Sequence, residues 1–135
     1  MVKFEVVDKG KQKGVPDAIA LEKLFDNGVF KLREPKDKLF LSRLSETHGL
    51  HIADAEVLAL AKECDGFAVI DDEVARKTAR VYGVEYVGTP YILERAVFEG
   101  LISKAEAKQA VNDMVSSGWR CSVESYAKII ALLEK

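Results

Sequence analysis

The stretch "HIADAEVLALAKECDGFAVIDDEVARKTA", residues 51–79, contains two helical patterns separated by a short apolar run. The apolar residues of 53–63 fall on most sides of a helix, which predicts that this helix is largely buried. "FAVI" (67–70) is too short for a helix, and a continuous apolar run of this length predicts a strand covered on both faces. "DDEVARKTARVYG" (71–83) predicts a second helix, ended by Gly83. The stretch therefore indicates a helix–strand–helix unit.

The same alternation of helix and strand extends to both sides. Helices are expected within 14–28 and 37–49, and short strands at 29–32 and 84–87. Strands separated by helices pair in parallel through right-handed crossovers. The sequence therefore predicts an α/β fold, a three-layer α/β/α sandwich with a short central parallel sheet.

Capping signals mark the helices of the C-terminal third. Thr89 is expected to cap the helix that follows, with Pro90 in its first turn. Ser103 and Glu106 have the spacing of a capping box, and Ser122 is expected to cap the last helix. These signals predict three helices after the last strand.

Composition limits the class of protein. A chain of 135 residues with 48% hydrophobic and 31% charged residues predicts one soluble globular domain, residues 1–135. It has no apolar run of the ~20 residues that a membrane helix needs, and its N-terminus lacks a signal-peptide core, so we expect a cytoplasmic protein and no membrane partner. A net charge of −2 excludes a global attraction to nucleic acid but allows local contacts through Lys and Arg. Cys64 and Cys121 lack metal-site or CxxC spacing, so we expect buried thiols.

Among the acids of residues 51–79, four lie near the start of the first helix or directly after the 67–70 run: Asp54, Glu56, Asp71 and Asp72. Ligands of open parallel sheets bind beyond the carboxyl ends of the strands, where Asp71 and Asp72 follow the 67–70 run. If the 53–63 helix begins at the same edge, Asp54 and Glu56 approach them. Clustered carboxylates suit Mg²⁺ or Mn²⁺, and such an ion can activate water and neutralise a phosphate.

Each of these residues also has an ordinary structural interpretation. Asp at the first positions of a helix bonds to unpaired backbone amides and favours the helix dipole. Arg76 and Lys77 could contact phosphate one turn beyond Asp72, or simply form a solvated helix face. His48 and His51 are expected to make loop hydrogen bonds rather than share a metal. The residue pattern alone leaves capping and metal binding both open.

The order of several motifs resembles PIN-domain proteins, in particular their VapC-like branch. The matching segments are "EVVDKGKQKGVPDA" (5–18), the acidic helix start with "ALA" (59–61), "IDD" (70–72), "GT" (88–89), "GLI" (100–102) and "SGWRCSVESYAKII" (117–130). The resemblance covers nearly the whole chain and lies in the order and spacing of these motifs.

The resemblance implies a Mg²⁺- or Mn²⁺-dependent endoribonuclease that cleaves single-stranded RNA, such as the toxin of a toxin–antitoxin pair. By similarity, Asp54, Asp72 and Glu5 are the catalytic acids, and Glu56 and Asp71 join Asp54 and Asp72 as metal ligands. The implied partners are an RNA substrate, an antitoxin protein and a second copy of the chain in a homodimer.

The N-terminus departs from the family pattern. The family begins with a strand that ends in an aspartate, followed by a helix, and here Met1 lies just before the "EVV" segment. Either "VKFEVVD" (2–8) is that strand, with Asp8 at its end, or it is the family's helix that carries Glu5; the downstream match favours the helix. The rival interpretation is a degenerate, non-catalytic PIN-fold module that acts in dimerisation or protein binding.

Overall fold

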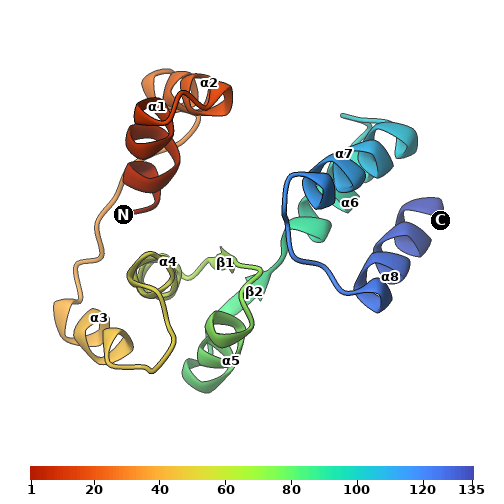
Figure 1. Ribbon diagram of the computed structural model, residues 1–135. Helices are drawn as coiled ribbons and strands as arrows, with labels where there is room; N and C mark the ends of the chain where they lie inside the picture. Colours follow the sequence, from red (N-terminus) through yellow and green to blue (C-terminus); the bar gives the residue numbers. More distant parts are fainter. The chain divides into compact units, whose positions relative to one another are not determined.

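The computed structural model describes residues 1–135, which form two compact units, Met1–Tyr86 and Val87–Lys135. The first unit contains a short π-helix and five α-helices: η1 (Phe4–Asp8), α1 (Lys9–Gln12), α2 (Pro16–Asp26), α3 (Lys38–Ser45), α4 (Ile52–Glu63) and α5 (Glu73–Tyr82). It also holds β1 (Phe67–Val69), which pairs with β2 (Glu85–Val87) where the two units join (Figure 1). The second unit consists of α6 (Thr89–Phe98), α7 (Lys104–Ser116) and α8 (Val123–Glu134). The α/β class is confirmed.

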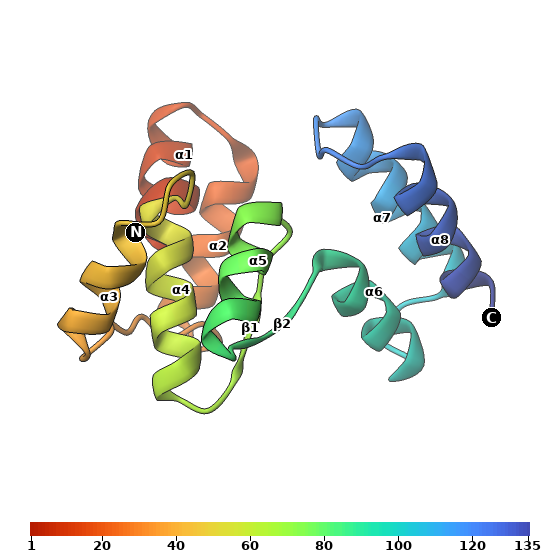
Figure 2. The same cartoon turned by 90° about the horizontal axis from the view of Figure 1, so that it is seen from below.

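Helix α4 is the centre of the first unit's core. Small residues on this helix let it pack closely against its neighbours β1, α3 and α5. Helices α4 and α5 lie side by side (Figure 2). The fully buried side chains of this core include Leu44 of α3, Leu58 of α4 and Ala75 of α5. The largely buried helix predicted at 53–63 is confirmed.

The sheet consists of the two parallel strands β1 and β2. Along β1 and the residue after it, Ala68 and Ile70 are only 2% and 4% exposed and face the core. Phe67 and Val69 point the other way and are 53% and 49% exposed. The prediction that this strand is covered on both faces is therefore wrong, because its second face opens onto a groove.

The strand predicted at 29–32 does not form. These residues adopt no helix or strand, and all four are exposed. Their alternating apolar residues favour a strand, but a strand also needs a neighbouring backbone for its hydrogen bonds. Neither β1 nor β2 supplies one, since the sheet contains only those two strands.

The N-terminal segment is helical, as the preferred interpretation predicted. Val7 of η1 is fully buried, and η1 continues directly into α1. A Cβ added at Gly10 would lie 2.8 Å from the Cβ of Ala18, so α1 approaches α2 more closely than any side chain at position 10 allows. Glu5 therefore lies on a helix, where the family resemblance places it.

The second unit is a set of three helices with its own core. Ala107 and Val111 of α7 pack against Ile129 and Leu133 of α8. The unit is a separate small cluster of apolar side chains rather than part of the core around α4.

Two of the three predicted helix caps are confirmed. Ser103 Oγ accepts a hydrogen bond from the Glu106 N–H at 3.0 Å, and Glu106 Oε2 accepts one from the Ser103 N–H at 2.6 Å. Ser122 caps α8 by accepting a hydrogen bond from the Ser125 N–H at 3.1 Å. The cap predicted at Thr89 is wrong, because α6 begins one residue earlier and Gly88 occupies its N-cap.

Both cysteines are free thiols, but the prediction that they are buried is wrong. Cys64 is exposed and Cys121 is half-buried. Cys64 is the C-cap of α4, where the helix ends and the chain turns toward solvent. No helix of the structure combines the length and apolar character needed to cross a membrane.

Candidate acidic site

Asp54 lies in the first turn of α4, where the charges of two other acids act on it. Helix α4 begins after His51, which makes no side-chain capping bond, so Asp54 is a first-turn residue rather than a cap. Burial raises the pKa of the Asp54 carboxyl, the negative charge of Asp72 raises it further, and Glu5 adds to this in the same direction. The charge of His51 acts in the opposite direction and lowers the pKa. The charges of Asp72, at the start of α5, and of Glu5, on η1, therefore act on Asp54 of α4.

Asp72 caps helix α5 in addition to acting on Asp54. It is the N-cap of α5, and its Oδ2 accepts a hydrogen bond from the Ala75 N–H at 2.9 Å. The capping interpretation of Asp72 is thus confirmed. A carboxylate has a second oxygen and further lone pairs, so one capping bond leaves acceptor capacity on the same side chain. Capping and metal binding are compatible at this residue.

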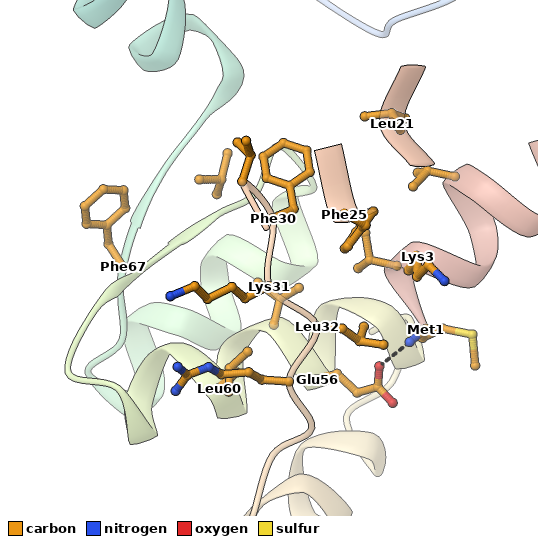
Figure 3. Close-up of a pocket in the computed structure, with 16 residues that line it drawn as sticks. Met1, Lys3, Leu21, Phe25, Phe30, Lys31, Leu32, Glu56, Leu60 and Phe67 are labelled. Atoms are coloured by element: carbon orange, nitrogen blue, oxygen red, sulfur yellow. Dashed lines mark ion pairs between the residues drawn. The ribbon is translucent and has the colours of Figure 1, made fainter. Parts of the chain in front are cut away.

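Asp71 and Glu56 have cationic partners. Asp71 Oδ1 lies 3.6 Å from Nη2 of Arg76. Glu56 Oε2 lies 2.9 Å from the N-terminal nitrogen of Met1, a contact drawn in Figure 3. Neither acid is among the charges that shift the pKa of Asp54. The charges of Asp72 and Glu5 thus act on Asp54, whereas Asp71 and Glu56 lie beside cations.

The donor chemistry of the acidic site suits a hard divalent ion. Asp54, Asp72 and Glu5 offer only carboxylate oxygens, the ligands that Mg²⁺ and Mn²⁺ prefer. A cation beside Asp54 and Asp72 would offset the repulsion that raises the pKa of Asp54. In this structure no three His, Cys, Asp or Glu side chains are close enough together to hold a metal ion. The residues therefore fit a metal by their chemistry, and ligation by three of them requires side chains to move closer.

The cationic side chains of α5 form a second feature next to the carboxyl end of β1. Arg76 Nε donates a hydrogen bond to the Ile70 carbonyl at 3.2 Å, and its guanidinium lies 5.8 Å from the ring centroid of Tyr86. Arg80 donates to the Tyr86 hydroxyl at 2.6 Å and also lies over its ring. Lys77 is exposed on the same helix. The sequence analysis did not identify Tyr86. The pattern that could have identified it is an aromatic residue on the strand that follows α5, a helix with two arginines four residues apart.

In open parallel sheets, ligands bind beyond the carboxyl ends of the strands, which is where Asp72 follows β1. A profile of the PIN domain matches residues 1–135, the whole chain, and the chain belongs to the PIN-domain family. PIN domains are generally nucleases that depend on a divalent metal. No curated protein and no solved structure matches the sequence.

Proposed function

We propose that this chain is a Mg²⁺- or Mn²⁺-dependent endoribonuclease of the VapC-like branch that cleaves single-stranded RNA. The observation that carries the proposal is the environment of Asp54, whose pKa is raised by burial and by the negative charges of Asp72 and Glu5, which come from two other elements. Asp54 and Asp72 are the principal metal ligands, with Glu5 completing the set. Asp71 and Glu56 are secondary ligands that would have to leave their cationic partners.

The side chains around the acidic site have distinct roles in this proposal. A bound divalent ion would lower the pKa of a water and neutralise charge on the scissile phosphate. Arg76 is held beside the carboxyl end of β1 by Ile70 and Asp71, so its guanidinium is oriented before RNA binds. Arg76 binds a phosphate oxygen of the RNA, and the exposed Lys77 attracts the RNA backbone through its charge.

An RNA cleavage assay tests the proposal. A single-stranded RNA pool labelled with a fluorophore and a quencher is incubated with the protein and Mn²⁺, and separately with EDTA. We expect cleavage that needs the ion and falls by about a hundredfold or more in Asp54→Asn/Asp72→Asn, since loss of charged ligands removes a charge-stabilising ion. Asn still accepts the capping bond at position 72, so this variant keeps the helix start.

The matched control is Asp26→Asn/Asp113→Asn, which removes the same number of charges outside the acidic site. It should cleave as the wild type does. Cleavage that persists in EDTA, or that survives in Asp54→Asn/Asp72→Asn, would contradict the proposed site.

The family match favours this nuclease over the non-catalytic PIN-fold module. A toxin role with an antitoxin partner follows only from the resemblance to the VapC-like branch, and so does a homodimer. Growth arrest on expression, relieved by a co-expressed protein that co-purifies with this chain, would support the toxin role. Light scattering of the purified chain tests the dimer.

A further inference from the structure

Two arginines of α5 share one aromatic partner, Tyr86 of β2. Arg80 Nη1 donates a hydrogen bond to the Tyr86 hydroxyl at 2.6 Å. The guanidinium carbons of Arg76 and Arg80 lie 5.8 and 5.9 Å from the centroid of the Tyr86 ring, within the range of a cation–π attraction. Tyr86 itself packs against the core around α4. A ring that is fixed by the core therefore orients both guanidiniums.

Arg80 also has an acid nearby, Glu73, but this ion pair is weak. Arg80 Nη2 lies 3.6 Å from Glu73 Oε1, which is longer than a hydrogen bond. The side chains are 54% and 66% exposed, and exposed pairs of this kind contribute little free energy. A guanidinium has several N–H donors besides the one that bonds to Tyr86. Arg80 therefore keeps both the access and the donors to bind an anion.

The two arginines extend from the acidic site along one face of α5. Asp72 is the N-cap of this helix, Arg76 lies one turn further and Arg80 lies a second turn further. Four residues of α-helix rise ~6 Å, which is about one nucleotide step of an extended single strand. A nucleic-acid strand whose phosphate contacts Arg76 can therefore place its next phosphate at Arg80.

We propose that Arg80, oriented by Tyr86, binds the phosphate next to the one that is cleaved, so that the RNA backbone runs along α5. This inference rests on the proposed function, in which Arg76 contacts the scissile phosphate, and it identifies how the RNA continues beyond that phosphate. Phosphate contacts position a strand without reading its bases. This subsite therefore selects substrates by length rather than by sequence, and a dinucleotide with a single phosphodiester should be a poor substrate.

Fluorescence anisotropy of a labelled single-stranded RNA tests the subsite without cleavage. Binding is measured in EDTA with Asp54→Asn/Asp72→Asn, whose acidic site repels RNA less, and with the same variant carrying Arg80→Gln. Arg80→Gln should weaken binding by about fivefold or more at low salt. It should also lower the slope of log Kd against log salt by ~0.7, the value for one phosphate contact of a single strand.

Two further substitutions in the same background check that the effect belongs to the subsite. Arg43→Gln is the matched control, because Arg43 is exposed on α3 and its loss removes the same charge. It should leave both affinity and salt slope unchanged. Glu73→Gln removes the acid beside Arg80 and should tighten RNA binding.

Tyr86→Phe separates the orientation of Arg80 from its charge. Phe keeps the ring and removes only the oxygen that accepts the Arg80 hydrogen bond. We expect Tyr86→Phe to weaken RNA binding by about twofold or more when Arg80 is present, because the guanidinium loses its orientation before binding. It should have no effect when Arg80 is Gln, since the hydroxyl acts only through Arg80.

RNA with one neutral linkage identifies the phosphate that Arg80 contacts. Methylphosphonates replace, one at a time, the phosphates on either side of the cleaved bond, and kcat/KM is measured with Mn²⁺ and intact acids. One of the two replacements should lower kcat/KM by about fivefold or more in the protein with Arg80. The same replacement should have little effect in Arg80→Gln, because the contact is already lost.

Three results would overturn the inference. Arg80→Gln could bind RNA with the same affinity and salt slope as Arg43→Gln, Tyr86→Phe could weaken binding equally with and without Arg80, or the methylphosphonate effects could persist undiminished in Arg80→Gln. Failure of the proposed function gives a different result. RNA binding that depends on Arg80, without any Mn²⁺-dependent cleavage by the wild type, would refute the nuclease and leave Arg80 as an RNA contact.

Discussion

Replacing Asp72 by Ala and by Asn separates its two roles at the start of α5. The carboxylate accepts the Ala75 N–H at 2.9 Å, and its charge acts on Asp54. Asp72→Ala leaves that N–H without its acceptor, which costs ~1 kcal/mol and lowers Tm by roughly 4 °C for a unit of this size. Asp72→Asn keeps an acceptor and removes a repulsive charge, so its free energy of unfolding should change by only a few tenths of a kcal/mol, ~0.3.

Urea unfolding followed by circular dichroism, without and with Mn²⁺, measures both effects. At a hundred times its dissociation constant, Mn²⁺ should stabilise the wild type by ~2.7 kcal/mol and neither variant appreciably. If Asp72→Asn destabilises the metal-free protein as much as Asp72→Ala, the capping argument fails. If Asp72→Asn keeps the full Mn²⁺ effect, Asp72 is a cap and no ligand.

Further predictions concern the charge of Asp54, the core and the second unit. The fold raises the pKa of Asp54, so the stability linked to this group is present at low pH and is lost as pH rises through the raised pKa. Asp54→Asn should therefore raise the free energy of unfolding of the metal-free protein at neutral pH. Urea unfolding at lower pH should show a smaller difference between the variant and the wild type, because protonation removes the charge of Asp54 from the wild type as well. Leu58→Ala should lower the free energy of unfolding by about 2–5 kcal/mol, because Leu58 is fully buried in the core around α4. Ser103→Ala should cost ~1 kcal/mol. Hydrogen bonds to Ser103 lower the pKa of Glu106. The stability that Glu106 adds is therefore present above its unfolded pKa and is lost as pH falls through the lowered pKa. Amide exchange of α7, measured over this pH range, would detect the loss.

Local patterns predicted the elements whose determinants lie close together in the sequence. Helix α5 could be predicted because Asp72 caps it and Gly83, with φ of 68°, ends it. The capping box of Ser103 and Glu106 is likewise complete within four residues. Residues 29–32 had the pattern of a strand, but pairing requires a neighbour that local sequence cannot supply. The exposure of Phe67 and Val69 has the same cause, since it depends on what packs against the second face of β1.

The candidate site was predictable in position but only partly in orientation. Spacing placed Asp54 and Asp72 at the starts of two adjacent helices, and the family resemblance supplied Glu5. The directions of Asp71 and Glu56 were not predictable, because their partners are Arg76, one helical turn away, and Met1, distant in the sequence. Opposite charges that meet only after folding decide such orientations.

The most direct test of the account is paramagnetic broadening of side-chain carboxyl ¹³C signals by Mn²⁺. Substoichiometric Mn²⁺ should broaden the signals of Asp54, Asp72 and Glu5 together, before that of Glu22, which pairs with Lys11 on the N-terminal helices. Uniform broadening of all carboxyl signals, or broadening of Glu22 before Asp54 and Asp72, would contradict the claim that these three acids form one metal site.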